Sequence, residues 1–163
     1  MKRWQKWLLV LLVIADTGCG SQAPPPPPAA PPPPPPTSIL ASIEAAVDIN
    51  PDPDGRPSPL RLRLYELKTP DKFNNSDFFS LYEQANAVLG ADLLGNDELL
   101  IKPGEKRLLE RVLTKDTLYL GILAAYRDLD RAVWRAILLI PPNQLTPVKI
   151  ELKSTAVTAE VTD

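Results

Sequence analysis

The stretch that decides the fold is residues 60–65, which reads Leu-Arg-Leu-Arg-Leu-Tyr. Its leucines occupy every second position, and arginines stand between them. Because successive side chains of a strand point to opposite faces, this period of two separates an apolar face from a charged face. The stretch therefore predicts a strand that is buried on one side only.

Further strand patterns occur on both sides of this stretch. Residues 43–49 alternate before it, and residues 148–152 read Val-Lys-Ile-Glu-Leu near the other end of the chain. Residues 117–126 are almost entirely apolar, which is typical of a central strand covered on both faces. Residues 133–140 follow as a return strand that two prolines stop, and residues 156–161 repeat the alternation more weakly. These segments indicate an all-β domain.

One segment has helical spacing instead. In residues 76–85 the apolar side chains share a helical face, with Asn75 or Ser76 as a candidate N-cap and Asp77 in the first turn. Together with the strands, this segment predicts an antiparallel β-sandwich of about eight strands with a small helical insertion. The residues expected in its core are Leu62, Leu64, Leu120, Ile122, Trp134, Ile150 and Leu152.

A second pair of strands is predicted around a turn at residues 102–105, Lys-Pro-Gly-Glu. Residues 98–101 and 106–113 flank this turn, and the arrangement is typical of a hairpin. Before it, Gly90, Gly95 and Asn96 are expected to break the chain.

The N-terminus has the organisation of a secretory signal. Three basic residues precede an apolar run at residues 7–15, and Gly18 stands before Cys19. The run is too short for a bilayer, which needs about 20 apolar residues. A lone cysteine after a small residue predicts a bacterial lipoprotein, in which residues 1–18 are removed and Cys19 is acylated. Asp16 departs from the usual pattern, which has an aliphatic residue there.

A proline-rich segment follows the cysteine. Residues 24–28 and 31–36 are all proline, a composition that adopts an extended polyproline II helix of about 3.1 Å per residue. Residues 20–38 could therefore reach roughly 60 Å. We expect a lipidated N-terminus and stiff stalk at residues 19–38, followed by one domain at residues 39–163.

Charge and sorting signals restrict the compartment and the partners. Cleavage before Cys19 removes three cations and one anion, so the formal charge changes from −2 to −4. A mildly acidic chain argues against nucleic acid as a partner. The residue after the cysteine is Gly20 and not an aspartate. In enteric-type sorting, this resembles the pattern of delivery to the outer membrane.

The residue types present exclude several kinds of chemistry. The chain has no histidine and a single cysteine, which removes Ser/His and Cys/His nucleophilic systems and most zinc sites. Asp128 and Asp130 alternate, but Arg127 and Arg131 flank them, which favours a solvated turn. We expect no enzymatic activity, no metal and no cofactor other than the covalent lipid on Cys19.

The connection at residues 50–59 contains four prolines and a glycine, which predicts a loop. It is longer than the roughly two to five residues of most hairpin connections. The spacing Asn-x-Asp-x-Asp-Gly at residues 50–55 matches the first half of an EF-hand loop, but Arg61 replaces the glutamate of the twelfth position. A rigid loop that carries an interface fits better than a calcium site, because prolines lower the entropy lost on binding.

A series of motifs occurs along the chain in a recognisable order. They are Asp-Ile-Asn-Pro-Asp at 48–52, Gly-Arg-Pro-Ser-Pro at 55–59, Leu-Arg-Leu-Tyr-Glu-Leu at 62–67, Phe-Phe-Ser-Leu-Tyr at 78–82, Leu-Leu-Ile-Lys-Pro-Gly at 99–104, Tyr-Leu-Gly at 119–121, Ala-Ala-Tyr-Arg-Asp at 124–128 and Trp-Arg at 134–135. This series, with the lipidation signal, resembles the type VI secretion lipoprotein family, also called TssJ, SciN or VasD. The resemblance covers about residues 40–153.

The resemblance implies a transthyretin-like sandwich that is lipid-anchored in the outer membrane and faces the periplasm, as part of the secretion machine's membrane complex. It implies that the loop between the first two strands binds the periplasmic C-terminal region of the large inner-membrane subunit, TssM. In this chain the loop comprises Asn50, Pro51, Asp52, Pro53, Asp54, Gly55, Arg56, Pro57 and Ser58. Arg56 is the favoured contact, because a guanidinium can pair bidentately with a carboxylate.

The alternative is a lipid-anchored carrier or glycan-binding module on the same fold. Such a module would need a concave site with aromatic side chains presented outward, whereas docking a protein needs an exposed, rigid loop.

Overall fold

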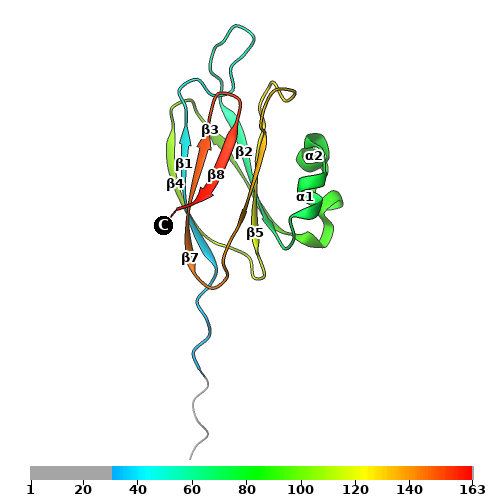
Figure 1. The fold of residues 1–163 in the computed structure, drawn as a ribbon, viewed down its shortest axis with the longest axis vertical. Helices are drawn as coiled ribbons and strands as arrows, with labels where there is room; N and C mark the ends of the chain where they lie inside the picture. The colour runs from blue at the N-terminus through cyan, green and yellow to red at the C-terminus, as the bar shows by residue number, and fades with distance from the viewer. Residues whose placement is uncertain (1–30, 163) are drawn as a thin grey trace, which may run out of the picture. The chain divides into compact units, whose positions relative to one another are not determined.

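Two four-stranded sheets face each other in residues 31–162, the part of the chain that the computed structural model describes (Figure 1). The β1 sheet has the order β4 (Lys106–Val112), β1 (Ser38–Ala45), β7 (Leu145–Leu152) and β8 (Val157–Val161). The β2 sheet has the order β3 (Leu93–Ile101), β2 (Leu60–Leu67), β5 (Tyr119–Ala124) and β6 (Arg135–Leu139). The predicted eight-stranded sandwich is confirmed, with one exception to its antiparallel pairing, because β1 and β7 run parallel.

Residues 1–30 and 163 lie outside the described residues. The predicted signal peptide, the acylation site at Cys19 and most of the stalk therefore lie outside them as well. From Pro33 onward the chain forms one compact unit. Within residues 31–162, no helix has the length and apolar character needed to cross a membrane.

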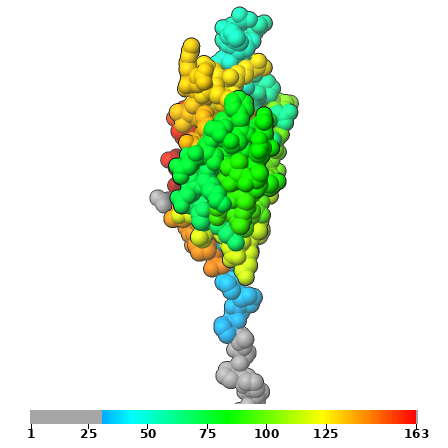
Figure 2. Space-filling view, turned by 90° about the vertical axis from the view of Figure 1, so that its right-hand side faces the viewer, coloured from blue at the N-terminus to red at the C-terminus, as the bar shows by residue number. Residues whose placement is uncertain are grey.

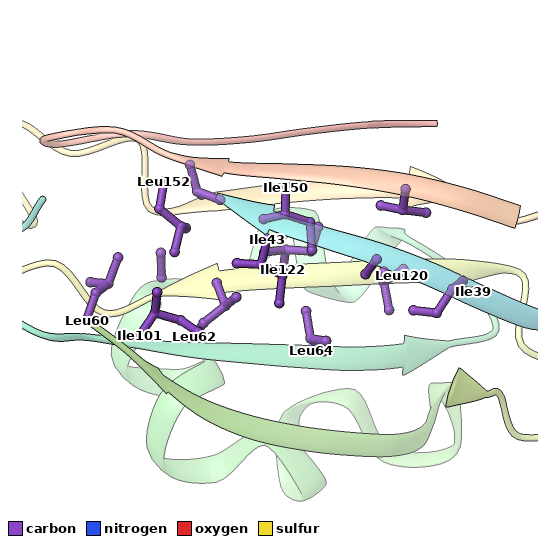
Figure 3. Close-up of a cluster of buried hydrophobic side chains, with 14 of the residues drawn as sticks. Ile39, Ile43, Leu60, Leu62, Leu64, Ile101, Leu120, Ile122, Ile150 and Leu152 are labelled. Carbon is purple, nitrogen blue, oxygen red and sulfur yellow. The ribbon is translucent and has the colours of Figure 1, made fainter. Parts of the chain in front are cut away.

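Apolar side chains from the facing sides of the two sheets form the core (Figure 3). The predicted core residues Leu62, Leu64, Leu120, Ile122, Ile150 and Leu152 are confirmed, each at 2% exposure or less. Trp134 is only half-buried, because it lies just before β6 at the margin of the sheet. There its ring packs edge-on against Phe78, with 5.4 Å between ring centroids.

The helical insertion covers the outer face of the β2 sheet and fills much of the face shown in Figure 2. It consists of α1 (Asp71–Asn75), α2 (Phe78–Leu89) and the 3-10 turn η1 (Gly90–Asp92). Phe73 and Leu81 pack against Tyr65, whose hydroxyl donates a hydrogen bond to the carbonyl of Leu81 at 2.9 Å. Strand β5 is therefore buried on both faces, as its apolar sequence predicted.

Several element boundaries differ from the prediction, and two of them have a clear local cause. The first strand spans Ser38–Ala45 instead of residues 43–49, and Val47 is 76% exposed because the chain has already turned away from the sheet. Helix α2 begins two residues later than expected, because the Asp77 side chain accepts a hydrogen bond from the Ser80 N–H at 3.0 Å and caps it.

The hairpin predicted at residues 102–105 is wrong. Strand β3 pairs with β2, whereas β4 pairs with β1, so the turn carries the chain from one sheet to the other. Gly95 and Asn96 do not break the chain; they lie inside β3, opposite Glu66 and Tyr65. A side chain at position 95 would come within about 3.1 Å of the Glu66 carboxyl group, so a glycine fits this close approach.

The strand directions separate the connections into two groups at opposite ends of the sandwich (Figure 1). The chain enters β1 at one end, where Thr37 is hydrogen-bonded to Leu113 and Asn143. The β1–β2 loop, residues 46–59, lies at the other end and projects beyond the sheets (Figures 1 and 2). We call this second end the loop end; it also carries the connections after β5 and β7.

Candidate functional site

The base of the β1–β2 loop is held by Asn50, which is only 4% exposed. Its backbone N–H donates to the carbonyl of Ser154 at 2.9 Å, and its side-chain amide donates to the carbonyl of Pro59 at 3.0 Å. Asn50 has a φ of 48°, a left-handed conformation that asparagine tolerates better than most residues. Ser58 is also buried, and its N–H bonds the carbonyl of Ile49. Both predicted site residues therefore position the loop.

The tip of the loop is closed by its own charged residues. One carboxylate oxygen of Asp52 accepts from the N–H groups of Asp54 and Arg56, at 3.0 and 2.9 Å. The other pairs with Nε of Arg56 at 3.1 Å, and Asp54 binds the same guanidinium at 2.5 Å. Gly55 turns the chain with a φ of 77°. The tip is a salt-bridged turn whose shape exists before any partner binds.

This arrangement bears on the predicted site in two ways. Arg56 is 73% exposed at its side chain, but its guanidinium already holds Asp52 and Asp54. The exposed members of the predicted site are Pro53, Asp54, Gly55, Arg56 and Pro57, whereas Pro51 and Asp52 are partly covered. No group of three ligating side chains that could hold a metal occurs among residues 31–162.

The loop is one wall of a groove of about 650 Å³ at the loop end. The opposite walls are the connections after β5 and β7. The groove is lined by Asn50, Pro51, Asp52, Pro53, Tyr126, Arg127, Asp128, Arg131, Ser154 and Thr155. Residues 127–131, which their sequence predicts to be a solvated turn, are indeed mostly exposed. Their position against the loop was not predicted.

Long-range hydrogen bonds fix these walls relative to one another. The side-chain carbonyl of Asn50 accepts from the Arg127 N–H at 2.8 Å. The hydroxyl of Tyr126 donates to the carbonyl of Lys153 at 3.1 Å, and burial raises the pKa of this hydroxyl well above its usual range. A third link joins Val133 N–H to the carbonyl of Thr155 at 2.9 Å. These bonds hold the walls of the groove in place. Of its lining residues, only those of the loop, residues 50–53, were predicted as site residues from the sequence.

Comparison with known proteins gives one family. Residues 37–155 match the family model described as type VI secretion lipoprotein, VasD, EvfM, TssJ. The comparison with curated proteins returned no match.

Solved structures agree with that match. The chain is 43% identical to the type VI secretion lipoprotein TssJ1 of Pseudomonas aeruginosa, with a TM-score of 0.77, covering 79% of this chain and 98% of that one. It is 27% identical to Lip of Serratia marcescens, a membrane-bound component of the type VI secretion system, with a TM-score of 0.71 and cover of 78% and 99%.

A third similar chain comes from a structure described as the C-terminal domain, residues 869–1107, of the type VI secretion protein TssM from EAEC. Identity is 22% and the TM-score 0.64, with 76% of this chain and 98% of that chain covered. At this identity, the likeness indicates a common fold.

Proposed function

Because the chain belongs to the type VI secretion lipoprotein family, we propose that its loop end docks the periplasmic C-terminal region of a TssM-like inner-membrane subunit. In this proposal the protein is anchored in the outer membrane by a lipid on Cys19 and faces the periplasm. The family is a structural lipoprotein of the secretion system and is not a known enzyme family.

The observation that carries the proposal is the shape of the β1–β2 loop. It projects from the end of the sandwich opposite to the point where the chain enters β1 (Figure 1). An anchor that precedes β1 therefore leaves the loop free to meet a partner. The closed turn around Arg56 supports the same role, since a preformed loop loses little entropy when it binds.

The TssM structure supports the choice of partner. From the shares of the two chains that are covered, the matched chain is about as long as the domain of this protein. Residues 869–1107 form a segment that is roughly twice as long. The matched chain is therefore shorter than the TssM segment for which that structure is named. Our proposal expects a structure that is named for the TssM domain to contain a chain with this fold.

The groove does not favour a carrier or glycan-binding module. A sugar site would need aromatic side chains presented outward, on whose faces the ligand can stack. Among the described residues that line the groove, the one aromatic side chain is Tyr126, which is 4% exposed and bonded to Lys153. Its ring has no open face for a ligand.

The test is a shortened loop in which residues 52–57 are replaced by Asn-Gly, while Asn50 and Ser58 remain. Closing a shorter loop changes the folding free energy little, so the melting temperature should stay close to that of the wild type. Binding to the purified periplasmic C-terminal region of the TssM-like subunit from the same bacterium should be lost. Lys115→Glu, an exposed change at the opposite end, should bind normally.

Two outcomes would reject the proposal. One is a wild-type protein that does not bind this region at all. The other is a folded, shortened protein that binds with unchanged affinity. If the shortened protein does not fold, Arg56→Glu in the full-length loop provides the same comparison, because it reverses the charge of the exposed tip without shortening it.

A further inference from the structure

We propose that the groove beside the loop is the second half of the docking site, and that Arg127 there binds a carboxylate on an extended segment of the partner. This inference rests on the proposed function and specifies its chemistry. It concerns the wall formed by residues 126–131, which the resemblance to the family did not implicate.

The groove is continuous with the docking loop. Residues 50–53 belong to the docking loop and also form one wall of the groove. A partner that contacts the loop therefore covers the groove as well. Because Asn50 bonds both Arg127 and Ser154, the opposite walls are held at a fixed distance from the loop. The groove needs no rearrangement before a segment of the partner enters.

The charged residues of the loop and the groove differ in whether they already have an ion-pair partner. In the loop, Asp52 and Asp54 are both occupied by Arg56. In the opposite wall, Asp128 pairs with Arg131 at 3.6 Å, and their side chains are 45% and 85% exposed. Arg127 is exposed and makes no ion pair among the described residues. The cation that remains available in the groove is therefore Arg127.

These observations define the chemistry of the ligand. A guanidinium prefers a carboxylate, which it can bind through two parallel hydrogen bonds. When a partner covers the groove and excludes water, the pair becomes stronger than it would be on an open surface. Asp130 is exposed on the same turn but does not line the groove, so it does not compete for this cation. Arginines in covered positions of this kind often dominate the affinity of an interface.

The experiment uses the full-length lipidated protein in detergent and the periplasmic C-terminal region of the TssM-like subunit as the probe. Arg127→Glu should raise the dissociation constant about tenfold or more, because it places like charges together. Arg127→Lys should have an intermediate effect, since a lysine keeps the charge but loses the bidentate geometry. Lys115→Glu changes charge equally at the opposite end and should stay within about twofold of the wild type.

Folding and salt provide the controls. The Arg127 backbone N–H, not its side chain, makes the bond to Asn50, so all these variants should melt near the wild-type temperature. The affinity of Arg127→Glu should also depend less steeply on salt than that of the wild type.

The outcomes separate the two proposals. If the shortened loop abolishes binding while Arg127→Glu binds within twofold of the wild type, the groove inference is overturned and the proposed function stands. If the wild type does not bind the probe, both are overturned. If Arg127→Glu weakens binding and Lys115→Glu does not, the carboxylate site is supported.

Discussion

The side-chain carbonyl of Asn50 accepts a hydrogen bond from the backbone N–H of Arg127 at 2.8 Å, across 77 positions of the sequence. Together with the bonds from Asn50 to Ser154 and Pro59, this contact joins three connections of the sandwich. Asn50, which is buried, thus holds the docking loop and the opposite walls of the groove in place relative to one another.

Asn50→Ala should therefore destabilise the protein and weaken docking together. The change leaves the Arg127 N–H and the Pro59 carbonyl without their partner, and an unsatisfied buried group costs about 1–3 kcal/mol. Chemical denaturation measures the free energy of unfolding, and titration with the TssM-like region measures the affinity. A variant with unchanged stability and unchanged affinity would show that Asn50 does not organise the site.

Arg56→Ala should separate stability from binding. Its ion pairs with Asp52 and Asp54 are exposed, and exposed pairs contribute about 0–1 kcal/mol, so the melting temperature should hardly change. The loop tip would lose the ion pairs that close it. It should then bind the partner several-fold more weakly, because ordering the tip on binding costs entropy. Lys115→Ala removes an exposed cation at the opposite end of the sandwich and is the control with normal binding expected.

Leu64→Ala tests the core. The side chain is 2% exposed between the two sheets, so its truncation should cost about 2–5 kcal/mol in the free energy of unfolding. Leu108→Ala is the control on the outer face of β4, where the side chain is 73% exposed; its effect should stay within about 0.5 kcal/mol. Equal losses for the two variants would contradict the strand register described here.

Cys19→Ser tests the membrane anchor, which lies outside the described residues. Two or more acyl chains hold a protein stably at a bilayer, whereas the unmodified domain has no such attachment. The variant should move from the outer-membrane fraction to the soluble periplasmic fraction and should no longer support secretion. A wild-type protein already found in the soluble fraction would rule out lipidation as its anchor.

Local patterns in the sequence were sufficient for much of the fold. The alternation at residues 60–65 lies within β2 and correctly assigns the leucine face to the core. The opposite face, which was expected to be exposed, is buried at Tyr65 because the helical insertion covers it. The apolar run before Tyr126 likewise identified β5, which is covered by the core on one face and by α2 on the other.

Relations between distant segments were not accessible in this way. The turn at residues 102–105 has the composition of a hairpin, but local composition does not determine whether its flanking strands pair with each other or with strands elsewhere. The same distinction between local patterns and distant contacts applies to the site. Its loop was recognised from its prolines and its length, whereas the groove depends on Asn50 meeting Arg127, which only the topology brings together.

The central claim, that the loop end contacts the TssM-like subunit, is tested most directly in living cells. A photo-cross-linking residue placed at Asp54, on the exposed tip, should give a covalent adduct with that subunit in the lipidated, secretion-competent protein. The same residue at Lys115, at the other end of the sandwich, should give none. An adduct of equal yield from both positions, or none from Asp54 while secretion continues, would contradict the account.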